Sequence, residues 1–281
     1  MCRRCLRSIF LLLPLSFLTF GGSIAVADLM PSTAFFYGAR PPLDRLAGFD
    51  RVVVESENVN DLKHFQSRGA KLFAYVSVGE AEGWRESAKK LPQELFRGNN
   101  KQWQSRIADL TRSGWKHYLL EDRMAGLWAQ GYRCFFLDTL DSYQIPAGTP
   151  DERKTQATAL VDIIRSIHER FPGVQLLLNR GFEVLPDVAY LSVGLVAESL
   201  FQGWNAAIQQ YFPVAAADRE WLLNRLTEAR DHYGLPVTVI DYVDPERPDL
   251  ILDTTARITA LGFFPWVSTP SLDVVYIGAG R

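Results

Sequence analysis

The stretch Cys134-Phe135-Phe136-Leu137-Asp138-Thr139-Leu140-Asp141-Ser142-Tyr143 decides the fold of this chain. Its first four residues are apolar with no polar alternation, which is typical of a parallel strand that is buried on both faces. Such a strand needs a helix to cover it, and the segment 150–171 provides one. Its apolar residues recur at helical spacing, at Leu160, Ile163, Ile164 and Ile167. The stretch therefore predicts a strand followed by a helix, the repeating unit of an α/β domain.

This unit recurs on both sides of the stretch. Short apolar runs predict eight strands, at Ala34–Gly38, Arg51–Glu55, Lys71–Val78, Cys134–Asp138, Gln175–Asn179, Gly194–Glu198, Pro236–Asp241 and Gly262–Val267. Helical patterns predict helices at Leu62–Arg68, Pro150–Phe171, Asp218–Tyr233 and Asp253–Leu261. Eight strand–helix units predict an α/β fold, a single-domain (β/α)8 TIM barrel over residues 28–281. An open, doubly wound sheet is the alternative, but no glycine-rich turn follows the first strand.

Residues 1–27 have the pattern of a secretory signal peptide. Three arginines within residues 3–7 precede the apolar run Ile9–Phe20, and Ala25-Val26-Ala27 offers small residues for a cleavage site. The apolar run is short for a helix that spans a bilayer, although an uncleaved anchor stays as the alternative. We expect a mature chain that begins at Asp28 and is periplasmic or secreted.

Removal of that segment takes away three arginines and no acidic residue, so the formal net charge moves from −2 to −5. An acidic chain without a basic patch is not expected to bind nucleic acid, and it suits a neutral or cationic substrate. Cys2 and Cys5 leave with the segment, so Cys134 has no partner within the chain for a disulfide. The fold then depends on its apolar core, and we expect a monomer without membrane contact after cleavage.

The chemistry of a TIM barrel collects at the carboxyl ends of its strands. From these ends we expect the following residues to bind substrate: Tyr37, Tyr75, Glu80, Asp141, Tyr143, Asn179, Arg180, Asp241, Tyr242 and Trp266. No histidine is among them, because all four fall in helical or connecting segments, at His64, His117, His168 and His232. A metal-dependent barrel hydrolase and Ser–His–Asp catalysis usually require histidine near the strand ends. We therefore expect a reaction that uses no metal and no cofactor.

Asp138 and Glu198 end the fourth and sixth strands, and alternate strands contribute side chains to the same layer of a barrel. Glycoside cleavage needs one acid to protonate the leaving oxygen and a second carboxylate that faces the anomeric carbon. We predict that Asp138 and Glu198 are these catalytic carboxylates. Their separation would decide between retention and inversion, and the sequence leaves it open. Asp138 has an alternative role as a helix N-cap, although Asp141 suits that role better.

Two long motifs resemble those of glycoside hydrolase family 114. The first is Phe73-Ala74-Tyr75-Val76-Ser77-Val78-Gly79-Glu80-Ala81-Glu82, with Trp84 after it, and the second is Phe135-Phe136-Leu137-Asp138-Thr139-Leu140-Asp141-Ser142-Tyr143. The shorter segments Phe36-Tyr37-Gly38 and Ala197-Glu198-Ser199 fit the same family. The resemblance spans essentially all of residues 33–268.

The resemblance implies an endo-acting α-1,4-polygalactosaminidase, a metal-free barrel enzyme that cuts galactosamine and N-acetylgalactosamine polymers of biofilm and cell-wall matrices. It also implies Asp138 as the nucleophile and Glu198 as the general acid/base of a retaining reaction. A cationic, partly deacetylated polymer agrees with the acidic charge of the mature chain. Two alternatives stay open: a barrel of an exopolysaccharide system that binds polysaccharide without cutting it, and a glycosidase for a different sugar.

Overall fold

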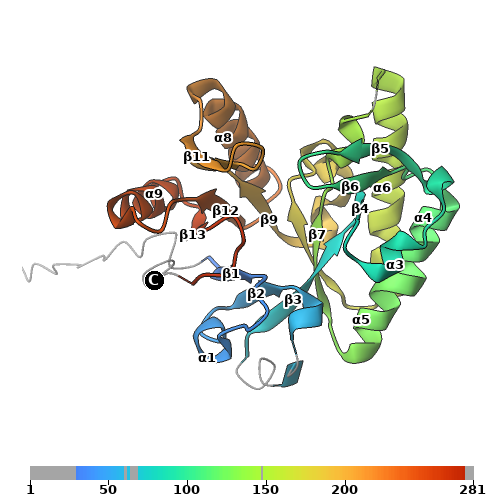
Figure 1. The fold of residues 1–281 in the computed structure, drawn as a ribbon, viewed down its shortest axis with the longest axis horizontal. Helices are drawn as coiled ribbons and strands as arrows, with labels where there is room; N and C mark the ends of the chain where they lie inside the picture. Colours follow the sequence, from blue (N-terminus) through green and yellow to red (C-terminus); the bar gives the residue numbers. More distant parts are fainter. Residues whose placement is uncertain (1–29, 60–61, 64–68, 147, 276–281) are drawn as a thin grey trace, which may run out of the picture.

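The computed structural model describes residues 30–59, 62–63, 69–146 and 148–275 of the chain. Its centre is one parallel sheet of eight strands in the order β1-β2-β3-β7-β8-β9-β12-β13. The strands are β1 (Thr33–Phe36), β2 (Arg51–Val54), β3 (Lys71–Ser77), β7 (Cys134–Asp138), β8 (Gln175–Asn179), β9 (Ser192–Glu198), β12 (Val237–Tyr242) and β13 (Phe264–Ser268). β1 and β13, at the two ends of this order, contact each other and bring the sheet round into a barrel (Figure 1). The predicted (β/α)8 fold is confirmed, and every predicted strand lies within two residues of its expected bounds.

Three long helices confirm the helical patterns in the second half of the chain. They are α6 (Pro150–Arg170), α8 (Ala216–Asp231) and α9 (Pro248–Ala260). α9 begins before the predicted Asp253, because Pro248 suits the first turn of a helix. The shorter helices are α1 (Leu43–Leu46), α3 (Glu86–Lys89), α4 (Ser113–His117), α5 (Ala125–Gln130) and α7 (Leu185–Val188), with a π-helical segment at Tyr118–Met124. Most of the helix predicted at Leu62–Arg68 lies outside the described residues.

Two antiparallel insertions that the sequence did not predict stand at the carboxyl ends of the barrel strands, which we call the mouth. A sheet of β4 (Glu80–Glu82), β6 (Ser105–Ala108) and β5 (Phe96–Asn100) follows β3, and a hairpin of β10 (Gln202–Asn205) and β11 (Gln210–Pro213) follows β9 (Figure 1). Their strands are short and mostly polar, so they lack the apolar runs that identify the barrel strands.

Neighbouring residues of the barrel strands fill two different layers. The ring of Phe136 points into the barrel and meets Phe35 at a centroid distance of 5.5 Å, and Phe35 meets Trp266 at 6.4 Å. The adjacent Phe135 points outward and packs against Phe171, which follows α6, at 6.1 Å. β7 is therefore buried on both faces, as its unbroken apolar run predicts.

The N-terminal segment cannot be compared with its prediction, because the expected signal peptide, residues 1–27, lies outside the described residues. Within the described ranges, no helix is both long and apolar enough to cross a membrane. Cys134 is a buried free thiol at the start of β7, and burial raises its pKa to about 11.

The start of α6 allows a test of the fold's local energetics. The Thr149 hydroxyl accepts a hydrogen bond from the Glu152 amide at 3.2 Å, and the Glu152 carboxylate accepts one from the Thr149 amide at 3.0 Å. We expect Thr149→Ala to lower the free energy of unfolding by about 1 kcal/mol, because it leaves one of these N–H groups without its acceptor. Urea unfolding measures this loss. Thr149→Ser keeps the hydroxyl and should unfold like the parent chain; equal stability of all three proteins would contradict the expectation.

Candidate active site

Three neighbouring strands end in polar side chains that meet at the mouth. Asp138 ends β7, Asn179 ends β8 and Glu198 ends β9. The Asn179 side-chain nitrogen donates to Oδ1 of Asp138 at 2.7 Å and to Oε1 of Glu198 at 2.8 Å. These two bond lengths limit the separation of the two carboxylate oxygens to 5.5 Å at most. We call this trio of side chains the Asn179 bridge.

Tyrosine hydroxyls donate hydrogen bonds to the other two carboxylate oxygens. Tyr75, from β3, donates to Oδ2 of Asp138 at 2.8 Å, and Tyr242, from β12, donates to Oε2 of Glu198. The Tyr37 ring stands edge-on to the Tyr75 ring at 5.4 Å. Each of the four carboxylate oxygens therefore has one donor. The carboxylates stay partly exposed, whereas both tyrosines that bind them are more than nine-tenths buried.

The backbone turns sharply just after each member of the Asn179 bridge. The next residues along the chain are Thr139, Arg180 and Ser199, with φ angles of 60°, 55° and 63°. Residues other than glycine rarely adopt this left-handed region, and each such residue costs about 1–3 kcal/mol unless its surroundings compensate. Hydrogen bonds to neighbouring strands hold two of these turns: the Arg180 amide donates to the Val196 carbonyl, and the Ser199 amide donates to the Ile240 carbonyl, both at 2.8 Å. The strained turns thus coincide with the site.

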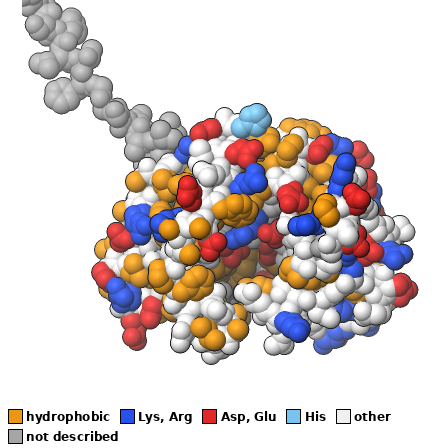
Figure 2. Space-filling view, turned by 90° about the horizontal axis from the view of Figure 1, so that it is seen from above, with side chains coloured by type: hydrophobic (Ala, Val, Ile, Leu, Met, Phe, Trp, Pro, Cys, Tyr) orange, Lys and Arg blue, Asp and Glu red, His pale blue; other side chains and the backbone are white. Residues whose placement is uncertain are grey.

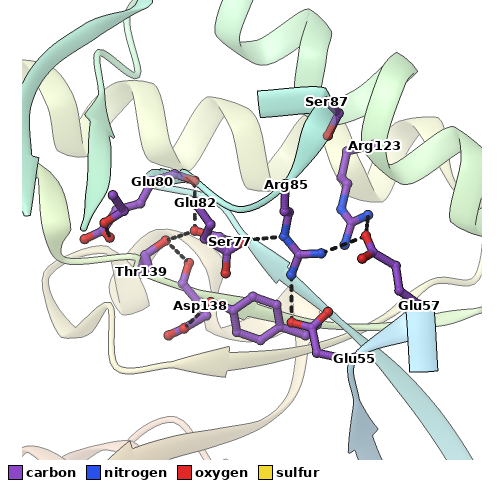
Figure 3. A network of polar contacts seen from close by, with 12 residues as sticks. Glu55, Glu57, Ser77, Glu80, Glu82, Arg85, Ser87, Arg123, Asp138 and Thr139 are labelled. Atoms are coloured by element: carbon purple, nitrogen blue, oxygen red, sulfur yellow. Dashed lines mark hydrogen bonds and ion pairs between the residues drawn. The ribbon is translucent and has the colours of Figure 1, made fainter. Parts of the chain in front are cut away.

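A side chain of β3 and a main-chain amide of the segment after it hold the third turn. The Thr139 hydroxyl accepts from the Gly79 amide at 2.8 Å and lies 3.0 Å from the Ser77 hydroxyl (Figure 3). A Cβ at Gly79 would lie 2.2 Å from the Thr139 carbonyl oxygen, which leaves no room for a side chain. Glycine is therefore required at position 79 so that the backbone that follows Asp138 can pass close to it.

Burial and like charge act together on Asp138. Burial is the largest cause that raises the pKa of Asp138, and the negative charge of Glu198 is the second. Together they raise it to about 7, while the hydrogen bonds from Asn179 and Tyr75 oppose the rise. Burial raises the pKa of Tyr75 and Tyr242 well above 10, and the carboxylate charges raise it further. Both tyrosines therefore stay neutral hydrogen-bond donors at physiological pH.

Three more carboxylates surround one arginine beside the bridge. Arg85 is 6% exposed and forms ion pairs with Glu55 at 2.7 Å, Glu57 at 3.0 Å and Glu82 (Figure 3). Its guanidinium lies 5.8 Å from the centre of the Tyr75 ring, so the cluster adjoins the site. The sequence analysis did not identify this cluster. The Glu82–Arg85 spacing of three residues was the available signal, but it is common on exposed surfaces.

Two other expected ligands lie near the bridge. The Arg180 guanidinium donates to the main-chain carbonyl of Glu198 at 2.9 Å, which fixes the strand end. Asp141 lies close to Arg180, whose charge limits the rise that burial causes in its pKa. Figure 2 shows the face on which the insertions stand, with a hollow near its middle and acidic, basic and hydrophobic side chains around it.

Four residues that we expected to bind substrate are buried in structural roles instead. Glu80 accepts hydrogen bonds from Asn100, Ser105 and Ser142, and Asp241 accepts three from backbone amides, so neither has a free oxygen pointed at the mouth. Tyr143 is 2% exposed and its hydroxyl donates to Glu183, and Trp266 is fully buried between Phe35 and Phe49. The remaining expected residues surround the Asn179 bridge: Tyr37, Tyr75, Asp141, Arg180 and Tyr242.

Most of the chain is similar to solved structures of other proteins. The hydrolase domain of PelA from Pseudomonas aeruginosa is 39% identical, with a TM-score of 0.80 over 88% of this chain and 97% of that one. The Aspergillus fumigatus Ega3 complex with galactosamine is 15% identical, with a TM-score of 0.61 over 86% and 92%. An α-amylase from Geobacillus thermoleovorans is 10% identical, with a TM-score of 0.53 over 89% and 72%, and at these identities the last two share only the fold. No curated protein matches the chain.

The match to a family model is nearly as long as the chain. The model of glycoside hydrolase family GH114 matches residues 27–280, a range that includes all eight barrel strands and the Asn179 bridge. The chain therefore belongs to glycoside hydrolase family GH114 and is a glycoside hydrolase.

Proposed function

We propose that this protein is a retaining, endo-acting hydrolase of α-1,4-linked galactosamine and N-acetylgalactosamine polymers, with Asp138 as nucleophile and Glu198 as general acid/base. The observation that carries the proposal is the Asn179 bridge, because it limits the facing oxygens of Asp138 and Glu198 to 5.5 Å. Retaining glycosidases separate their carboxyl groups by about 5–5.5 Å, whereas inverting enzymes need roughly 6.5–9.5 Å to admit a water molecule.

In the first step, an oxygen of Asp138 attacks the anomeric carbon while the glycosidic C–O bond breaks. Protonated Glu198 gives its proton to the departing oxygen, so the polymer leaves as an alcohol and the sugar is bound to Asp138 as an ester. In the second step, Glu198 takes a proton from water, and the resulting hydroxide attacks the same carbon. Asp138 leaves as a carboxylate, Glu198 is protonated again, and the sugar recovers its original configuration.

The charge coupling in the site favours a pair of carboxylates that holds one proton between them. The negative charge of Glu198 is one of the two causes that raise the pKa of Asp138. Protonation of Glu198 removes that repulsion and favours ionised Asp138, whose oxygens still accept hydrogen bonds from Asn179 and Tyr75. One carboxylic acid and one carboxylate then lie side by side, as the first step requires.

The charge around the mouth supports a cationic substrate. Glu55, Glu82 and Asp141 lie close enough to the bridge for their charges to act on it or on its tyrosines. Three described arginines, Arg85, Arg123 and Arg180, face four carboxylates once Glu57 is counted, so they compensate only part of this charge. An ammonium group on a deacetylated amino sugar would be attracted to such a mouth. The galactosamine bound in the fungal Ega3 structure is consistent with this substrate class.

The cellular context is part of the same proposal. The signal-peptide pattern of residues 1–27 supports a periplasmic or secreted enzyme, since an extracellular polymer can be cut only by an enzyme that is exported. We propose that this enzyme acts as a monomer. The competing hypothesis is a barrel that binds the polymer without cutting it.

The acid/base role of Glu198 is the first testable prediction. We expect Glu198→Gln to lower kcat on partly deacetylated galactosamine polymer by about 10²- to 10⁴-fold, because the amide cannot donate or accept the proton. Circular dichroism and melting temperature should stay close to those of the parent protein. Glu220→Gln removes an exposed carboxylate on α8 and should keep full activity. Full activity of Glu198→Gln would refute the assignment, and binding without products from the parent protein would favour the non-cutting barrel.

The stereochemistry gives a second prediction. Proton NMR of a digest of defined α-1,4-linked galactosamine oligomers should detect the α-anomer of the new reducing end before mutarotation, because two displacements restore the configuration. Mass spectrometry of the same digest should detect internal cleavage products of several lengths. A β-anomer formed first would exclude retention.

The pH dependence gives a third prediction. The first step requires a pair of carboxylates that holds one proton. The pKa of about 7 is that of Asp138 beside ionised Glu198, so the pair loses this proton at higher pH, and kcat/KM should fall as the pH rises above about 7. Tyr75→Phe removes a donor that lowers the pKa of Asp138, so this alkaline limb should move to higher pH. Tyr118→Phe removes a hydroxyl that pairs with Ser87 and should leave the limb in place. A shift of the Tyr75→Phe limb to lower pH would contradict this account.

A further inference from the structure

Asp241 is a fully buried carboxylate that occupies a cradle of backbone amides. Its two oxygens accept from three consecutive N–H groups: Leu200 at 2.6 Å, Phe201 at 2.8 Å and Gln202 at 2.9 Å. Consecutive N–H groups that point at one centre form an anion-binding site, and here the anion is supplied by the chain itself. Burial raises the pKa of Asp241 to about 7, while the three amides oppose this rise.

The cradle begins two residues after Glu198. Between them, Ser199 adopts a left-handed backbone with φ of 63°. Leu200, Phe201 and Gln202 then lead directly into the β10–β11 hairpin at the mouth. The place of Glu198 at the end of β9 therefore depends on what holds this turn, because a residue other than glycine is not stable there without support.

Three consecutive residues of the neighbouring strand β12 bind this turn or the Glu198 side chain. The Ile240 carbonyl accepts from the Ser199 amide at 2.8 Å, the Asp241 carboxylate accepts from the amides of the cradle, and the Tyr242 hydroxyl donates to the Glu198 carboxylate. Ile240 also faces Glu198 in the register of the two strands. Because successive residues of a strand point to opposite faces, Asp241 holds the backbone from outside the barrel, and Tyr242 holds the side chain from inside.

We propose that Asp241 is a positioning residue for catalysis: by binding the amides of residues 200–202 it fixes the turn that aims the Glu198 carboxylate at the glycosidic oxygen. This rests on the proposed acid/base role of Glu198. Asparagine at position 241 would place an amide N–H₂ against donors that need an acceptor. At least one amide of the cradle would lose its partner, and the strained turn would relax.

The test separates loss of proton donation from general damage by means of two substrates. One is partly deacetylated galactosamine polymer, whose leaving alcohol needs a proton. The other is a 2,4-dinitrophenyl α-glycoside of a galactosamine oligomer, whose leaving phenolate needs none. Stopped-flow absorbance records the first turnover of the second substrate, which reports attack by Asp138 alone.

We expect Asp241→Asn to lower kcat on the polymer by about 10- to 100-fold with KM within about twofold, and to leave the first-turnover release of dinitrophenolate within about threefold. Glu198→Gln should likewise lower kcat on the polymer, by a larger factor, and affect the dinitrophenyl substrate less. The matched control is Val239→Ala, which lies on the same strand and the same face and is also buried. It should lower the melting temperature without changing either rate below the transition.

An equal fall on both substrates, or no fall on the polymer, would overturn the proposal. If Asp241→Asn does not fold, Asp241→Glu keeps a charged acceptor for the three amides but displaces them by one methylene. Asp241→Glu should lower kcat on the polymer by a smaller factor and again leave the dinitrophenyl substrate less affected. An equal fall on both substrates, or no fall on the polymer, would overturn the proposal here too. Full activity of Glu198→Gln would instead refute the proposed function, whatever Asp241 does.

Discussion

The Asn179 amide is the interaction on which the site depends. Two carboxylates whose facing oxygens lie within 5.5 Å repel each other where little water screens them, and both N–H groups of this one amide lie between them. Tyr75 and Tyr242 supply the remaining donors, so no carboxylate oxygen lacks a partner. The amide therefore stabilises the two carboxylates at this short separation. The short separation in turn allows one carboxylate to attack the anomeric carbon while the other donates a proton to the departing oxygen.

The barrel allows this arrangement because its strands are rigid up to the residue where each side chain is needed. Thr139, Arg180 and Ser199 all adopt left-handed backbones, each one residue beyond a member of the Asn179 bridge. Strain of this kind persists only where the surroundings determine the backbone fully. Hydrogen bonds from neighbouring strand ends provide that support, so the positions of the catalytic side chains are set by the parallel sheet rather than by mobile loops.

The sequence predicted the barrel and the residues that meet at the centre of the candidate site, but it did not predict what the residues beside them contact. Short apolar runs, most of them unbroken, identified all eight strands, because their length and their β-branched and aromatic residues favour a strand buried on both faces over a helix. The antiparallel insertions were missed because their short strands are mostly polar. The carboxylate cluster around Arg85 was missed because it joins the end of β2 to the segment after β3. Ion pairs between residues so far apart in the chain leave no pattern in the sequence.

Two of the expected ligands that the structure buries, Asp241 and Trp266, differ from Tyr242 in the direction or in the depth of the side chain. Tyr242 and Asp241 are neighbours in β12, so only one of them can face the inside of the barrel, and Tyr242 does. Trp266 does face the inside, but it pairs with Ile240, whereas Ser268 pairs with Tyr242 at the level of the mouth. Trp266 thus lies one layer too deep to reach a substrate. Residue type alone does not tell which strand-end residue can contact the sugar and which one supports a neighbouring residue. That distinction requires both the alternation of side chains along the strand and the register between strands.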